Sequence, residues 1–313
     1  MVTRRILLGV FIILILLSQL TAFSLTRDEL ISYLEARERA VRNFRVKGVF
    51  DAGFYHTEES GSDPAGTVEF QFETTWKSDN QVMMHGVEYR NGKKASESKI
   101  AYNLENRYVL NLLPVYPPKS YEGAEAVGSI SVPADNEKLF SGLSGYMAFP
   151  KYWELIKPVM KVNGELTMVY LSDIIRRGKQ LDIKEIRPGV YEASVQHYPV
   201  EDGIYPSEIT VVIDTSDNHL FPMKVIHERY APSPGFLYIL ECVDHVTVGD
   251  YKLPSRVKIY RGPAENKTPD TVNYEEAIYN VVELNKPEID EMSFKIPFDE
   301  KTVIYDEGRE SFH

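Results

Sequence analysis

The sequence predicts an α+β fold built on one large antiparallel sheet of about 11 strands, with a helix at its start and a helical insertion in its middle. Three observations support this class. "TVEFQFETTWK" (67–77) alternates apolar and polar residues, as a strand with one covered and one wet face does. "VTVGDYKLPSRVKIY" (246–260) joins two such runs at Gly249-Asp250, a two-residue hairpin turn. Thr26 and Glu29 form a capping box, which opens a helix.

The first 24 residues have the pattern of a secretory signal peptide. Arg4 and Arg5 precede the apolar run "ILLGVFIILILL", and Ala22 and Ser24 stand at the −3 and −1 positions of a cleavage site. This pattern predicts an exported protein, periplasmic or secreted, with a mature chain of residues 25–313. The alternative is an uncleaved anchor that tethers the protein to the membrane. Otherwise we expect membrane contact to be transient.

Charge and cysteine content limit the partners and the means of stabilisation. The 313-residue chain has a formal net charge of −11, which argues against nucleic acid and anionic membrane surfaces as partners. Cys242 is the single cysteine, so no internal disulfide can form. The core must therefore hold the fold, which is feasible because a chain of this size buries ~75% of its unfolded surface.

The first half of the mature chain predicts one helix and then strands. The helix runs through "LISYLEARERAVRNF" (30–44), where Leu30, Leu34, Val41 and Phe44 share one face. A proline-rich segment, 114–134, follows the strands and predicts a connection over the surface. The expected strands are 45–56, 67–77, 81–90, 96–104 and 107–113.

The second half predicts a helical insertion at about 135–178 and then more strands. The insertion contains the short pieces "DNEKLFSGLSGYMAF", "KYWELIKP" and "VYLSDIIRRG". No linker is long or polar enough to divide the mature chain, so residues 25–313 are expected to form a single domain. The expected strands are 180–186, 190–198, 207–214, 221–231, 236–248, 251–261 and 274–284.

The hairpin at Gly249-Asp250 also predicts its own register. A two-residue turn sets Val246 opposite Leu253, and Pro254 opposite His245. Proline has no N–H to give to a neighbouring strand, so we expect a bulge, an edge or a gap on the other side of Pro254. The remaining expected pairs are Cys242–Val257, Leu240–Ile259, Glu241–Lys258 and Asp244–Ser255.

Catalytic patterns are weak, which predicts a protein that is not an enzyme and uses no metal or cofactor. The seven histidines do not pair at metal-ligand spacing on a helix, and there is no glycine-rich phosphate loop. "GLSGY" (142–146) is one position away from a nucleophile elbow, and no strand leads into it. Cys242 lies in the middle of a strand, where a buried thiol is inert. A hydrolase with an unrecognised site is the remaining catalytic alternative.

Three segments resemble the lipoprotein-localisation-factor-like superfamily. "EITVVIDTSDNHLFPMKVIHERY" (208–230) resembles its strand–turn–strand, in which "ID" ends one strand and a proline leads into the next. "VTVGDYKLPSRVKIY" resembles the hairpin that follows, and "FKIPFDEKTVIYDE" (294–307) resembles the closing segment. The order of elements is similar over most of the mature chain.

The resemblance implies an unclosed β-barrel in a bacterial envelope, with helices on its concave face and an apolar cavity that accepts a lipid, an acyl chain or a lipid-modified protein. An envelope protein is a second expected kind of partner. We hypothesise that sheet and insertion residues face each other across this cavity. The alternatives are a dry core, and a module that binds a protein or glycan on its sheet surface. The hypothetical lining is Phe70, Phe72, Trp76 and Met84 from the sheet, with Phe140, Tyr146 and Trp153 from the insertion.

Overall fold

The structure is a computed structural model. The described residues are 25–54, 67–78, 81–103, 105–113, 115–131, 152–162, 165–197, 207–229, 235–263, 275–307 and 309–312. Segment 1–24, on which the signal-peptide prediction rests, lies outside them, and so do residues 132–151 of the predicted insertion. Within the described chain, no helix has the length and apolar character needed to cross a membrane.

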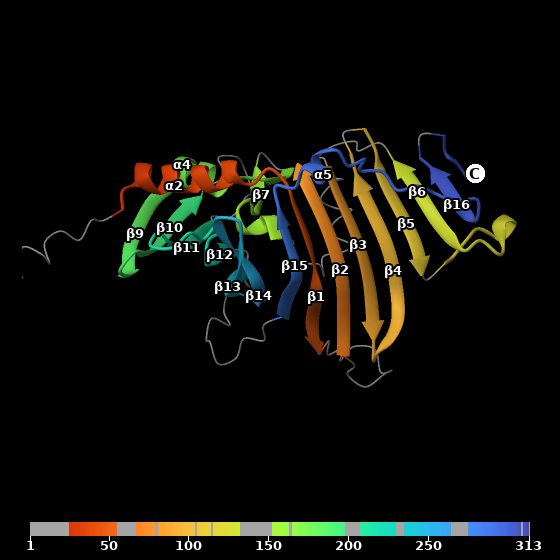
Figure 1. The fold of residues 1–313 in the computed structure, drawn as a ribbon, viewed down its shortest axis with the longest axis horizontal. Helices are drawn as coiled ribbons and strands as arrows, with labels where there is room; N and C mark the ends of the chain where they lie inside the picture. Colours follow the sequence, from red (N-terminus) through yellow and green to blue (C-terminus); the bar gives the residue numbers. More distant parts are fainter. Residues whose placement is uncertain are drawn as a thin grey trace, which may run out of the picture.

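One 15-stranded sheet runs along the long axis of the molecule (Figure 1). Its order is β17-β16-β6-β5-β4-β3-β2-β1-β15-β14-β13-β12-β11-β10-β9, and its two end strands are far apart, so the sheet is unclosed. The strand count exceeds the predicted value of about 11. All neighbours are antiparallel except β16 and β6, which are parallel.

The predicted strands form close to their expected bounds. In the first half they are β1 (Phe44–Phe54), β2 (Thr67–Ser78), β3 (Gln81–Arg90), β4 (Lys93–Tyr102) and β5 (Arg107–Leu113). In the second half they are β9 (Lys179–Arg187), β10 (Val190–His197), β11 (Ser207–Asp214), β12 (Lys224–Arg229), β13 (Phe236–Val248), β14 (Tyr251–Pro263) and β15 (Glu275–Leu284).

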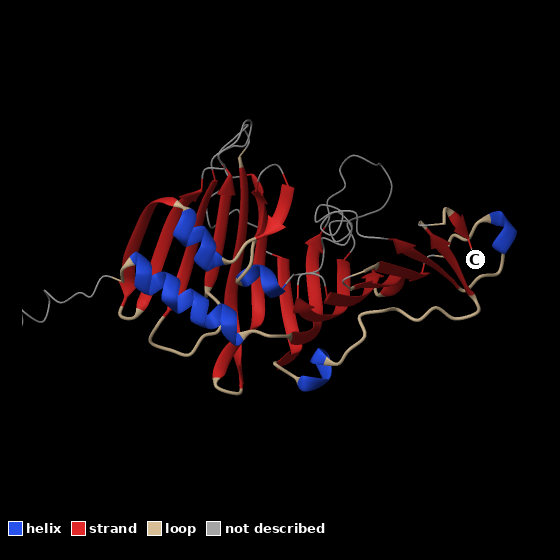
Figure 2. Cartoon of the chain, turned by 90° about the horizontal axis from the view of Figure 1, so that it is seen from above, coloured by secondary structure: helices blue, strands red, loops and turns tan. Residues whose placement is uncertain are grey.

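Helices α2 (Arg27–Ala40) and α4 (Leu171–Arg177) lie together over the end of the sheet that holds β9 to β12 (Figures 1 and 2). The capping box is confirmed, since the Thr26 N–H donates to Glu29 Oε2 at 2.8 Å. Helix α2 ends at Ala40, earlier than predicted. Phe44 therefore belongs to β1, although it is still fully buried.

Two predictions for the middle of the chain need correction. Segment 114–134 is not only a surface connection, because it contains the short helix η1 (Lys119–Tyr121) and the strand β6 (Ala126–Ser131). The described part of the insertion is not wholly helical either. It contains η2 (Tyr152–Leu155) and α4, but between them β7 (Val159–Val162) and β8 (Glu165–Met168) form a hairpin.

The β13–β14 hairpin has the predicted register over most of its length. Val246 pairs with Leu253, and Pro254 pairs with His245. Asp244 is the exception, because a bulge moves it from Ser255 to Arg256. The expected gap beside Pro254 is confirmed, since the pairing of β14 with β15 runs from Arg256 to Ile259 and leaves Pro254 outside. The other confirmed pairs are Cys242–Val257, Leu240–Ile259 and Glu241–Lys258.

The chain ends by crossing the sheet. After α5 (Pro287–Asp290), residues 291–301, here called the strap, run across β3, β4 and β5 to β16 (Thr302–Asp306), and β17 (Ser311–Phe312) follows (Figure 1). The strap is extended and carries the Phe298 ring over Gly128 of β6. A Cβ at Gly128 would lie 2.5 Å from that ring, so this approach requires glycine.

The two faces of the sheet therefore have separate cores. The inner face packs against α2 and α4, and its cluster includes Phe72, Trp76 and Met84 together with Leu30 and Ile174 of the helices. The outer face lies under the strap, and its smaller cluster is Ala101, Tyr108, Leu110, Ala126 and Ile296.

Candidate functional site

Tyr152 of η2 is the centre of the inner-face aromatic cluster. Its ring is 1% exposed and lies 4.8 Å from Tyr279, 4.9 Å from Phe221 and 5.4 Å from Phe44, between ring centroids. Its hydroxyl donates to the Pro254 carbonyl at 3.2 Å, on the strand where pairing with β15 has stopped. Burial raises the pKa of Tyr152 well above the ordinary range of a phenol, so this hydroxyl stays protonated.

The four predicted lining residues of the sheet all belong to this inner face. Phe72, Trp76 and Met84 are buried, and Phe70 is half-buried against the same cluster. The Trp76 ring stacks on Phe44 with centroids 5.3 Å apart. That these side chains line a ligand cavity stays a prediction.

The three predicted lining residues of the insertion have a different status. Phe140 and Tyr146 lie outside the described residues. The backbone of Trp153 belongs to η2, but its side chain is not described. The aromatic anchor that the structure describes in this segment is its neighbour Tyr152, which the sequence reasoning missed. Two adjacent aromatic residues in a segment of no clear period give no signal of which one faces the sheet.

One polar atom in this apolar cluster is left without a partner. The indole Nε1 of Trp76, a residue that is 5% exposed, meets no hydrogen-bond acceptor in the described structure. Buried tryptophan N–H groups usually find an acceptor, because leaving a buried donor unsatisfied costs about 1–3 kcal/mol. Trp76 therefore presents a donor to the inner face that an added carbonyl or hydroxyl oxygen could satisfy.

The charged groups near the inner face fasten the cover to the sheet. The Glu38 carboxylate of α2 accepts from the backbone N–H of Ser172 in α4 at 2.9 Å and also from its hydroxyl. Tyr238 of β13 donates to Glu154 Oε2 of η2 at 2.8 Å. These contacts are structural, and they hold α2, α4 and η2 in place.

Catalytic chemistry finds little support in the described residues. Among them, no three side chains of His, Cys, Asp or Glu are grouped so as to hold a metal ion. The Cys242 thiol is buried and donates to the Pro222 carbonyl at 3.3 Å, and burial raises its pKa, so the reactive thiolate is disfavoured. "GLSGY" (142–146) lies outside the described chain.

Comparison with known proteins gives remote structural matches. No family model and no curated protein matches the chain. A domain described as an outer membrane lipoprotein-sorting protein domain from Vibrio parahaemolyticus shares 9% identity over 84% of this chain and 94% of that chain, with a TM-score of 0.39. A LolA superfamily protein from Nitrosomonas europaea shares 10% identity over 82% of this chain and 94% of that chain, with a TM-score of 0.36. These descriptions agree with the superfamily that the three sequence segments resemble.

Proposed function

We propose that this protein is an exported, non-catalytic carrier of the bacterial cell envelope that holds a lipid, an acyl chain or the acyl chains of a lipoprotein against the inner face of its sheet. The acyl chain would lie along β2 to β4, beside the Tyr152 cluster. Its ester or amide carbonyl would accept a hydrogen bond from Trp76 Nε1.

The unpaired donor of Trp76 is the observation that carries this proposal. A core that only stabilised the fold would gain from an apolar ring at this position, or from an acceptor placed next to the indole. The surrounding side chains, including Phe72 and Met84, are apolar and match an alkyl chain. An acyl ester supplies both the apolar body and the missing acceptor.

The energetics of a carrier also suit this surface. Burying alkyl carbon is worth about 0.8 kcal/mol per CH₂, so two long chains would bind too tightly to be released unless part of that energy is offset. Displacing packed side chains offsets part of it. Met84 is suited to this because its unbranched side chain adopts many shapes at low cost.

Binding of an uncharged acyl ester tests the proposal. The mature chain should bind the fluorescent ester methyl cis-parinarate. Phe70→Glu, which places a charge on the half-buried edge of the inner face, should abolish binding. Trp76→Phe keeps the apolar surface and removes the donor, so it should weaken binding several-fold. Tyr116→Ser, at a side chain that is 80% exposed, is the matched control and should leave binding unchanged.

Lipid analysis of the purified protein provides an independent check. Solvent extraction followed by mass spectrometry should release acyl lipids from the wild-type protein and fewer from Phe70→Glu. If no lipid is found and no ester binds, the carrier proposal fails. The inner face would then be a filled core, and the alternative of a protein- or glycan-binding module would gain. Its surface would include the exposed apolar side chains Val243, Ile278 and Val281.

A further inference from the structure

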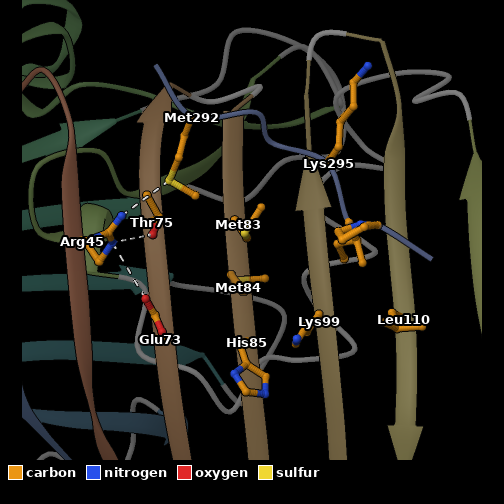
Figure 3. A pocket seen from close by; sticks show the side chains of 12 residues that line it. Arg45, Glu73, Thr75, Met83, Met84, His85, Lys99, Leu110, Met292 and Lys295 are labelled. Atoms are coloured by element: carbon orange, nitrogen blue, oxygen red, sulfur yellow. Dashed lines mark hydrogen bonds and ion pairs between the residues drawn. The ribbon is translucent and has the colours of Figure 1, made fainter. Parts of the chain in front are cut away.

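A separate hollow of about 300 Å³ lies on the outer face, between the sheet and the strap (Figure 3). Strands β3 to β5 supply Met83, His85, Lys99 and Leu110, and the strap supplies Met292 and Ile296. Met84 also borders this hollow, although its side chain belongs to the inner-face cluster. The hollow is therefore distinct from the proposed acyl-binding surface on the other side of the same strands.

The roof of this hollow is fixed at both ends. At the start of the strap, Lys77 Nζ donates to the Asp290 carbonyl at 2.7 Å, and Arg45 Nη2 lies 3.6 Å from Met292 Sδ. At the far end, the Phe298 ring rests on Gly128. The space between the anchors is thus a built feature with one strap wall and one sheet wall.

The hollow is positive in a protein that is strongly negative overall. Its lining contains three cationic side chains, Arg45, Lys99 and Lys295, against the single carboxylate of Glu73, whereas the whole chain carries −11. This local excess favours an anion at the hollow.

Most of these charges already have partners. Arg45 lies 3.2 Å from Glu283 and 3.8 Å from Glu73, so its charge is compensated. His85 Nε2 lies 2.9 Å from the Glu97 carboxylate. Lys99 differs, because its half-buried ammonium makes no ion pair with any described residue. Lys99 is therefore the group that an anionic ligand would neutralise.

We propose that the hollow binds a single-chain anionic amphiphile, with its carboxylate on Lys99 and its alkyl chain between Met83, Leu110 and Met292. The thioether and leucine side chains give an adaptable apolar wall, and the ammonium gives a point charge for the head group. A volume of 300 Å³ lies at the small end of ligand pockets, which run from about 300 to 1,000 Å³, so it suits one short chain and excludes a two-chain lipid. This site does not depend on the inner-face carrier function.

Calorimetric titration of the mature chain with decanoate tests the site. Decanoate should bind, and decanol and decyltrimethylammonium, which keep the chain but lose or reverse the charge, should bind at least about tenfold more weakly. Lys99→Gln should weaken decanoate binding about tenfold or more. Lys93→Gln, at an exposed position on the same strand, is the matched control and should have no effect. Phe70→Glu should also have no effect, which separates this site from the inner face.

A second readout locates the ligand. In spectra of the protein with ¹³C-labelled methionine methyl groups, decanoate should shift the signals of Met83 and Met292 and leave that of Met223, which does not border the hollow, unchanged. Equal affinity for decanol and decanoate, or wild-type affinity in Lys99→Gln, would overturn the proposal. Loss of decanoate binding in Phe70→Glu, or the absence of any methionine shift, would overturn it as well.

Discussion

The two faces of the same strands are covered in different ways. On β3, Val82 and Met84 face inward, where rings and helices form a large apolar core, whereas Met83 and His85 face outward, toward ion pairs and a hollow under the strap. The inner cover comes from the start and middle of the chain, and the outer cover comes from its end (Figure 2). The comparison suggests that the inner face carries most of the stability, and that the outer face can hold small ligands because it is less completely packed.

Removing the central ring of the inner face should have the largest effect. Tyr152→Ala deletes a fully buried ring that touches three other rings, so it should lower the free energy of unfolding by about 3–5 kcal/mol. Urea denaturation measures this loss. Tyr116→Ala, at an exposed tyrosine, should change stability by less than about 0.5 kcal/mol. Similar losses for the two variants would contradict the assignment of stability to the inner face.

Lifting the strap should have a smaller effect. Gly128→Val places a side chain where the Phe298 ring lies, so the strap must move away from β6, at a cost of about 1–3 kcal/mol. The free energy of unfolding, together with the rate of proteolysis within 291–301, measures the displacement. Adding Phe298→Ala should recover part of the loss, because it removes the clash. Additive losses in the double variant would show that the two residues do not meet.

Acid should loosen the part of the molecule beside α2. His219 and His245 lie ring to ring with centroids 4.4 Å apart, and the His219 carbonyl accepts from Arg37 of α2. Burial, with Lys252 nearby, lowers the pKa of His245 from 6.5 to about 4, against the opposite influence of Asp217 and Asp244. Burial lowers the pKa of His219 too.

The sign of the pH effect follows from these shifts. Between pH 6.5 and about 4 the unfolded His245 binds a proton that the folded form does not, so stability should fall as the pH falls through this window and stay level above it. Urea unfolding at a series of pH values measures the slope, which His245→Gln should reduce. An unchanged slope in that variant would assign the acid sensitivity to other groups.

The smallest effect is expected for an exposed ion pair on the outer face. Arg256 Nη2 and Nε donate to Glu276 at 2.9 and 3.2 Å across the short β14–β15 pairing. Because water and salt screen such pairs, Glu276→Gln should lower the melting temperature only slightly, and the difference should vanish in molar salt. A large loss that persists in high salt would mean that outer-face charges stabilise the sheet more than this comparison allows.

The sequence predicts the strands that have a clear signal of their own. Alternation places β2 with Phe72 and Trp76 inward, and the Gly249-Asp250 turn gives the register of the longest hairpin. The error at Asp244 arises from a bulge, which turn geometry cannot predict because it depends on the neighbouring strand. β6 escapes prediction because glycine and serine have low strand propensity, and its Gly128 is needed by a ring 170 positions away.

The candidate sites are less predictable than the strands. Residue type indicates that Phe72, Trp76 and Met84 suit an apolar surface, but only packing shows that Trp76 Nε1 is unsatisfied. The hollow near Lys99 has no sequence signal, because its walls come from β3 to β5 and from a strap almost 200 residues further along the chain. A lysine in a charged strand such as "KKASESKIAY" is indistinguishable from an ordinary surface lysine until the strap is placed beside it.

The most direct test of the two-faced account is to locate a bound acyl chain. An uncharged spin-labelled stearate ester is added to the deuterated mature chain, and paramagnetic broadening of the backbone amide signals is measured. The account predicts broadening at Phe70, Trp76 and Met84 of the inner face, little at Lys99, and none in Phe70→Glu. Broadening confined to the exposed outer side chains Val243 and Ile278, or no broadening at all, would contradict it.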